Sequence, residues 1–257
     1  FAFLMKTALV TSPFWVWDLA IMPPGFRHPN FALEQTVTAG KTPFHLWTEV
    51  GATKAVTPQE IAALVETTQK SIEKEITIFG SPPVAVDKSV DVNVVLAEIK
   101  PYVKNGKTFG SDGYFNMYDQ LSEEGAQKDE QHSNQRNVIY LNSLSDLTSP
   151  YVQGVYVHEL AHLLVFARHK DDPSFELDPW VSELLGEAAM QTANLYTDHV
   201  HATRYIQNLD QPIAVTGYGL SYGALSMFAE FLIDIFGEEK MGDLAGSNTA
   251  NSFRKFE

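Results

Sequence analysis

The sequence predicts an α+β fold, in which a β-rich N-terminal part and a mixed sheet precede a mainly helical C-terminal half. Three observations lead to this prediction. Residues 1–50 are rich in aromatic and β-branched side chains, which favour strands. Two later apolar runs, residues 91–99 and 137–142, have the length of buried strands. After Ser149 the apolar segments are longer and follow a helical period.

Residues 1–50 are expected to form a β-rich N-terminal part of their own, and residues 51–257 the second, larger domain. Gly40 and Lys41 separate two strand-like runs and so predict a hairpin. We expect the aromatic side chains here to lie in the core rather than on a carbohydrate-binding face. The expected strands are residues 14–17, 31–38 and 43–50.

Residues 57–79 carry the signals of a scaffold helix. Thr57, Pro58 and Glu60 combine an N-cap, a proline at the first helical position and a capping-box glutamate. Apolar residues then recur on one face until Gly80, where the helix is expected to end.

Composition limits the kinds of partner and metal site. The formal net charge of the 257 residues is −14, which argues against nucleic-acid backbones and anionic membranes as partners. The chain has no cysteine, so metal ligands would have to be His, Asp or Glu. No apolar run approaches the roughly 18 residues that a membrane span needs.

The apolar residues 1–10 lack a basic leader and a clear cleavage site, so we do not expect an intact signal peptide. The chain begins with Phe1 rather than Met, which is compatible with earlier removal of a leader or propeptide. Nothing in the sequence indicates the oligomeric state.

An apolar helix is expected over about residues 150–169, because Ser149 supplies an N-cap and Pro150 suits the first helical position. The segment is apolar nearly all round, as in a buried central helix. A carboxylate buried in such a helix without a partner would be costly, so a metal centre is a reasonable explanation for it.

His158 and His162 lie four residues apart and therefore project from one face of this helix, where both can bind one zinc ion. Glu159 is near enough to reach a zinc-bound water, whose pKa falls to about 7, and to take its proton. This is the HExxH arrangement. The alternative is a surface helix that carries two unrelated histidines.

A third ligand is expected downstream, on a helix over about residues 180–197. Glu183 and Glu187 lie four apart on one face of it. One can bind zinc while the other accepts the remaining ring N–H of a ligating histidine. The alternative is a solvated helix face, and the loop residues Glu176 and Asp178 are weaker ligand candidates.

The motifs HELAH at residues 158–162 and WVSELLGE at residues 180–187 together resemble the gluzincin zinc metallopeptidases, and most of all the hyicolysin-type peptidases of bacteria. A weaker resemblance to the same peptidases extends over about residues 45–240. Ser182 stands where that family usually has Asn, and Leu184 where it usually has Gly. The softer matches are residues 112–115, 137–143 and 218–222 and the helix end at 236–237.

In those peptidases the third zinc ligand is the first glutamate of a W-[LV]-N-E-G-like motif. The resemblance therefore implies a zincin-like fold and one Zn²⁺ ion held by His158, His162 and Glu183. It implies Glu159 as the general base. Glu187 is then the candidate partner of a ligating histidine.

Gly113, Tyr114 and Phe115 are expected at the sheet edge along the cleft, where such peptidases bind the extended backbone of a substrate. The alternative for these residues is a flexible surface loop. Attack on a peptide bond also needs a donor for the developing oxyanion, and Tyr222 and then Tyr218 are the candidates, unless both merely pack. His199 and His201 cannot face the same way on a helix, so no second metal is expected there, and a surface role is favoured.

The sequence thus predicts a zinc-dependent endopeptidase that acts on proteins or peptides, and the resemblance implies a secreted or extracellular bacterial hydrolase. Two alternatives stay open. One is a zinc aminopeptidase, although no acidic motif before HELAH clearly provides the carboxylates that read a free amine. The other is a non-catalytic surface or binding protein on a peptidase-like scaffold.

Overall fold

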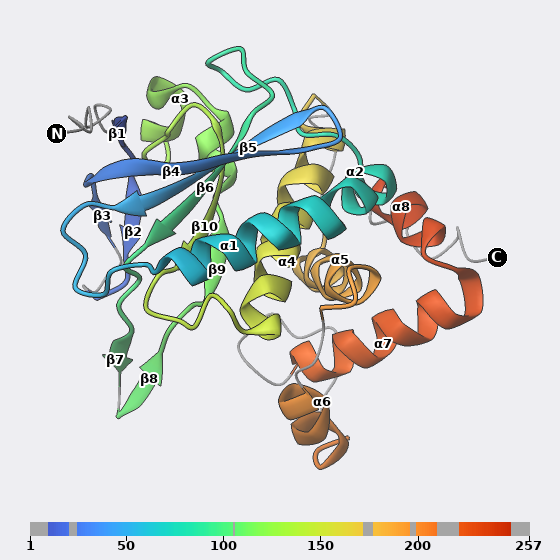
Figure 1. Ribbon diagram of the computed structural model, residues 1–257. Helices are drawn as coiled ribbons and strands as arrows, with labels where there is room; N and C mark the ends of the chain where they lie inside the picture. Colours follow the sequence, from blue (N-terminus) through green and yellow to red (C-terminus); the bar gives the residue numbers. More distant parts are fainter. Residues whose placement is uncertain are drawn as a thin grey trace, which may run out of the picture. The chain divides into compact units, whose positions relative to one another are not determined.

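The computed structural model shows an α+β protein with a six-stranded mixed sheet (Figure 1). Its contacts divide the chain into two compact units. Unit 1 comprises the residues up to Val65 together with Val84–Leu147, and unit 2 comprises Glu66–Pro83 and the residues from Thr148 onward. The structure describes residues 10–20, 25–104, 106–171, 177–195, 199–209 and 221–247.

The sheet of unit 1 has the order β1-β4-β5-β6-β10-β9. Strands β5, β6 and β10 run parallel to one another, and the remaining neighbours are antiparallel. Figure 1 shows β4, β5, β6 and β10 side by side. The strands of this sheet are β1 (Thr11–Pro13), β4 (Asn30–Ala39), β5 (Thr42–Glu49), β6 (Val92–Ala97), β9 (Gly113–Phe115) and β10 (Asn137–Asn142).

Shorter elements complete unit 1 among the described residues. Two small antiparallel ribbons pair β2 with β3 and β7 with β8. These elements are β2 (Val16–Asp18), β3 (Gly25–Arg27), β7 (Tyr102–Lys104), β8 (Lys107–Phe109), the 3-10 turn η2 (Met117–Gln120) and α3 (Glu123–Gln127).

The hairpin predicted around Gly40 is confirmed, since β4 and β5 pair in antiparallel register and Gly40 takes a positive φ of 57°. The described residues before residue 50 are rich in strands, as predicted. Strand β5 pairs with β6, from Phe44 opposite Val92 onward, so the N-terminal strands extend the same sheet as the later ones. The backbone pairing of β5 with β6 could not be read from local sequence.

Four aromatic residues of the N-terminal part, Phe14, Phe31, Phe44 and Trp47, lie in the core, as predicted. Phe14 and Phe31 are fully buried and meet edge to face. Tyr114 of β9 lies between Trp17 and Tyr140, with ring centroids 4.7 and 4.2 Å away. Its hydroxyl also accepts a hydrogen bond from the Trp17 backbone. The β9 side chains therefore help to hold the sheet edge in place.

The helix predicted over residues 57–79 is present, with a change of geometry inside it. Thr57 and Glu60 exchange hydrogen bonds as a capping box. The helix ends at Gly80, whose φ of 108° suits glycine. A π-helical turn separates its two α-helical parts, and the division between the units falls inside the first of them. The parts are α1 (Pro58–Thr67), η1 (Thr68–Ile72) and α2 (Glu73–Phe79).

Unit 2 is helical in its described residues. Helix α4 packs on α5, α5 packs on α7, and α7 packs on α6 and α8. No described helix is both long enough and apolar enough to cross a membrane. Besides η1 and α2, its helices are α4 (Pro150–His169), α5 (Pro179–Thr192), α6 (His199–Ile206), α7 (Ser221–Phe236) and α8 (Glu239–Ala245).

Both helices that carry the HELAH and WVSELLGE motifs begin with a proline at the first position, as the sequence predicted for α4. Ser149 has the extended backbone of an N-cap, although its side chain does not cap the helix. Helix α5 ends at Thr192, five residues before the predicted end at 197, because Asn194 adopts a left-handed φ of 55°. The Leu195 amide then bonds the Met190 carbonyl, which closes the helix end.

Candidate metal centre

Helix α4 holds His158 and His162 on one face, one turn apart. Their ring centroids lie 4.8 Å apart at an interplanar angle of 81°. The side chains are 8% and 14% exposed, so both imidazoles have lost most of their contact with water. Helix α4 is apolar around them, and it is buried through residues such as Leu160 and Leu164.

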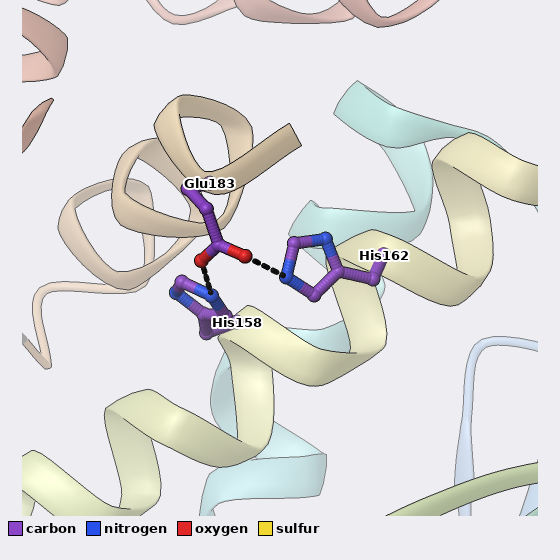
Figure 2. Close-up of side chains that lie close together, drawn as sticks. All are labelled: His158, His162 and Glu183. Carbon is purple, nitrogen blue, oxygen red and sulfur yellow. Dashed lines mark hydrogen bonds and ion pairs between the residues drawn. The ribbon is translucent and has the colours of Figure 1, made fainter. Parts of the chain in front are cut away.

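Helix α5 brings Glu183 to the two imidazoles (Figure 2). Its Oε2 lies 3.2 Å from Nε2 of His158, and its Oε1 lies 3.9 Å from Nε2 of His162. One ligand atom from each of the three residues lies within 4.8 Å of the other two. The Glu183 side chain is 33% exposed, which leaves this side of the cluster open to solvent.

The other ring nitrogen of each histidine faces a second partner on α5. Ser182 Oγ lies 3.0 Å from Nδ1 of His162. Glu187 Oε1 lies 3.7 Å from Nδ1 of His158. The hydrogen bond to Ser182 orients the His162 ring and leaves its Nε2 for a metal, whereas Glu187 faces His158 at ion-pair distance.

Gly186 allows helix α5 to approach the His158 ring, a role that was not predicted from the sequence. A β-carbon at this position would lie 2.5 Å from Nε2 and 2.6 Å from Nδ1 of His158, far inside van der Waals contact. The signal in the sequence was a glycine inside a helix, one turn after Glu183, where a packing or functional reason is the usual explanation.

The site is electrostatically acidic. Burial lowers the pKa of His158, but the hydrogen bond to Glu183 and the charges of Glu159, Glu183 and Glu187 outweigh burial and raise it to about 9. Burial also lowers the pKa of His162, to about 4, with a contribution from His158. Burial raises the pKa of Glu183, but the two imidazoles more than compensate and bring it to about 2. A surplus of carboxylates around two imidazoles favours a bound cation.

Glu159 and Tyr222 belong to the same cluster. The Glu159 carboxylate is buried in α4, and its charge acts on both His158 and Tyr222. The Tyr222 hydroxyl donates a hydrogen bond to Glu183, and burial together with that carboxylate raises the pKa of the phenol well above its usual range. The first turn of α7 thus adds a phenol to the residues of α4 and α5.

His201 of α6 lies beside Tyr222, with the ring centroids 6.0 Å apart. The sequence favoured a surface role for this histidine, because nothing in its local pattern connects it with residue 222. The two helices meet through Gly223, where a β-carbon would overlap the His201 backbone and would lie 2.9 Å from the Ala202 amide nitrogen. That close approach accounts for the position of the imidazole.

Other predicted site residues lie elsewhere. Gly113, Tyr114 and Phe115 form the edge strand β9 of unit 1, not the surface loop that was the alternative, and their binding of substrate stays a prediction. Tyr218 and Glu176 fall outside the described residues. Asp178 serves as the N-cap of α5. Among the described residues, the only group of three potential ligands is His158, His162 and Glu183.

No protein-family model matches this sequence, and no curated protein matches it significantly. The resemblance to gluzincin peptidases therefore rests on the motifs themselves.

Proposed function

We propose that the chain is a zinc-dependent endopeptidase with a zincin-like catalytic arrangement. The observation that carries the proposal is the convergence of His158, His162 and Glu183, from two helices, to within 4.8 Å of one another. Glu159 beside them supports a hydrolase rather than a structural metal site, because a binding module has no need of a general base.

The donor set fits zinc. Two imidazole nitrogens and one carboxylate oxygen are the ligands of many catalytic zinc sites, which keep a fourth position open for water. The one-third exposure of Glu183 leaves room on that side. The carboxylates that raise the pKa of His158 stabilise positive charge beside it, whether a proton or a metal ion. A bound metal would therefore replace the proton at Nε2.

His158 and His162 would bind the metal through Nε2, and Glu183 through a carboxylate oxygen. When bound, zinc would act as a Lewis acid that makes a water molecule more acidic and polarises the scissile carbonyl. Ser182 would accept the Nδ1 proton of His162 and keep that ring in the required tautomer.

Glu159 would take a proton from the attacking water at its carboxylate as the oxygen bonds to the carbonyl carbon. It would then pass that proton to the leaving amine nitrogen as the C–N bond breaks. The Tyr222 hydroxyl would turn from Glu183 to the carbonyl oxygen, where negative charge develops. Glu183 and Glu187 of α5 also act on His158 and Tyr222, but Glu183 is the proposed ligand and Glu187 the proposed partner of His158, which leaves Glu159 as the base.

The test is digestion of casein by the purified chain with and without a chelator, beside the Glu159→Gln variant. We expect zinc-dependent cleavage by the wild type, and a variant that retains zinc but loses turnover by at least about 10³-fold. Full activity of Glu159→Gln would contradict the mechanism. Bound zinc without hydrolysis of any unfolded protein would contradict the proposal that the chain is an enzyme.

A second measurement separates endopeptidase from aminopeptidase activity. An endopeptidase cleaves a peptide with an acetylated N-terminus as readily as its free-amine counterpart, because it recognises the extended backbone. Cleavage of only the free-amine peptide, one residue at a time, would replace the proposal with an aminopeptidase.

A further inference from the structure

The outer face of α7 carries a stripe of exposed apolar side chains. Met227, Phe231 and Ile235 follow at intervals of four residues and are 38%, 55% and 60% exposed. Residues at this spacing lie along one face of a helix. The opposite face of α7 is buried through Leu225 and Leu232. The stripe is therefore additional to the face that packs in unit 2.

Acidic groups border this stripe, and no basic group of α7 balances them. Glu230 and Asp234 are exposed, each three residues after a member of the stripe, and α7 contains no Lys or Arg. Of the helices that pack on α7, α8 carries Lys240, which pairs with Asp243, and α6 carries the exposed Arg204. The surface of α7 thus combines apolar contact area with two exposed carboxylates.

We propose that Met227, Phe231 and Ile235, with Glu230 and Asp234, form a docking surface for a basic amphipathic helix of a protein partner. The apolar stripe would pack against the apolar face of that helix, and the two carboxylates would attract lysine or arginine residues beside it. In a dimer formed through this surface, the carboxylates of one copy would face those of the other and repel them. The same carboxylates would repel an anionic membrane. The surface does not depend on the proposed zinc chemistry.

The probe is a synthetic peptide of about 14 residues, roughly four helical turns, with leucines at helical spacing and lysines elsewhere. Its affinity for the full chain is measured by fluorescence anisotropy, beside a counterpart with glutamates in place of the lysines. We expect the Leu/Lys peptide to bind with an affinity that falls as salt is added, and the Leu/Glu peptide to bind at least about tenfold more weakly.

Two double variants locate the binding. Phe231→Ser with Ile235→Ser should weaken it by about tenfold or more, because both anchors of the stripe are lost. Glu230→Gln with Asp234→Asn should weaken it by about threefold and reduce its salt dependence. Circular dichroism confirms that each variant is folded.

The matched controls remove similar groups from unit 1. Met117→Ser with Leu121→Ser takes away side chains that are 49% and 38% exposed, and Glu124→Gln with Asp129→Asn removes two exposed carboxylates. Both should bind the Leu/Lys peptide as the wild type does. Equal weakening in the controls and the α7 variants would overturn the proposal, because binding would then not be specific to the surface of α7.

Two other outcomes would also overturn it. Self-association in sedimentation velocity that Phe231→Ser with Ile235→Ser abolishes would identify a second copy as the occupant. Binding to phosphatidylserine vesicles that the same variant abolishes would identify a membrane surface.

Discussion

At the scale of single residues, the contact of 3.0 Å between Ser182 Oγ and Nδ1 of His162 influences which ring nitrogen is left for a metal. A neutral imidazole has one donor and one acceptor nitrogen, so a hydrogen bond at Nδ1 determines the state of Nε2. In the sequence, Ser182 stands where the gluzincin peptidases that the motif resembles usually have Asn. Its partner became visible only once α4 and α5 were placed together.

We expect Ser182→Ala to weaken zinc binding by about 10- to 100-fold, because His162 loses the group that orients its ring. Ser182→Asn is the matched variant, since its side-chain oxygen can accept the same proton, and it should bind within about threefold of wild type. Competition with a chromophoric chelator measures both. Wild-type affinity in Ser182→Ala would show that the Ser182 contact has no part in holding the metal.

Glu75 is a second residue whose surroundings determine its chemistry, here the protonation state of its carboxyl group. It is fully buried in α2, Thr192 donates a hydrogen bond of 2.9 Å to Oε1, and Oε2 has no hydrogen-bond partner among the described residues. Burial raises the pKa of Glu75 to about 8, against a reference of 4.5. The folded state therefore prefers the protonated carboxyl, and its contribution to stability is lost as the pH rises through about 8.

The free energy of unfolding should accordingly fall between pH 6 and pH 9.5 in the wild type, and less so in Glu75→Gln. We expect the variant to gain roughly 2–4 kcal/mol relative to the wild type over that range, because its amide cannot ionise. Urea denaturation at constant ionic strength gives the comparison. Parallel pH profiles for the two proteins would show that Glu75 is not the titrating group.

At the scale of elements, the sequence predicted where helices and strands begin better than how they pair. The prolines at 150 and 179 start α4 and α5, and the Thr57 capping box starts α1. These signals are local. The early end of α5 depends on the left-handed conformation of Asn194. Asparagine can adopt this conformation but need not, so the residue type alone did not predict the end of the helix. The pairing of β5 with β6 joins segments far apart in the chain, and no local signal encodes it.

In the candidate site, too, the features that depend on local sequence were predicted and those that depend on contacts between helices were not. The HELAH spacing placed two imidazoles on one helix face, because that geometry follows from the helical period alone. Glu183 was assigned by resemblance, and its proximity to both rings is a property of how α4 packs on α5. Gly186 was missed for that reason, and the position of His201 beside Tyr222 was not foreseen, since each depends on a contact between helices.

Gly186→Ala tests the packing of α5 on α4. The added methyl group would displace the His158 ring, so we expect zinc affinity to fall by at least about tenfold. Alanine favours a helix over glycine by about 1 kcal/mol, so unfolding of α5 would not explain the loss. Isothermal titration with zinc measures the affinity.

Gly154→Ala is the matched control in α4. There the new β-carbon would meet the end of the flexible Met190 side chain, 2.6 Å away, which can move aside. This variant should bind zinc as the wild type does. Equal affinity in Gly186→Ala and wild type would mean that the His158 ring does not need its position against α5.

At the scale of the whole molecule, the proposed ligands all belong to unit 2, and the sheet belongs to unit 1. The three candidate ligands therefore all come from the helical unit. The chain carries a net charge of −14, and three of its carboxylates lie around the two imidazoles of the cluster. A bound divalent cation would relieve that local excess of negative charge.

The metal content of the purified chain tests the central claim most directly, measured by inductively coupled plasma mass spectrometry for the wild type and for Glu183→Gln. Three ligands that share one ion predict about one equivalent of zinc in the wild type and a loss of most of it in the variant. No zinc in the wild type after dialysis against zinc, or one equivalent retained in Glu183→Gln, would contradict the account.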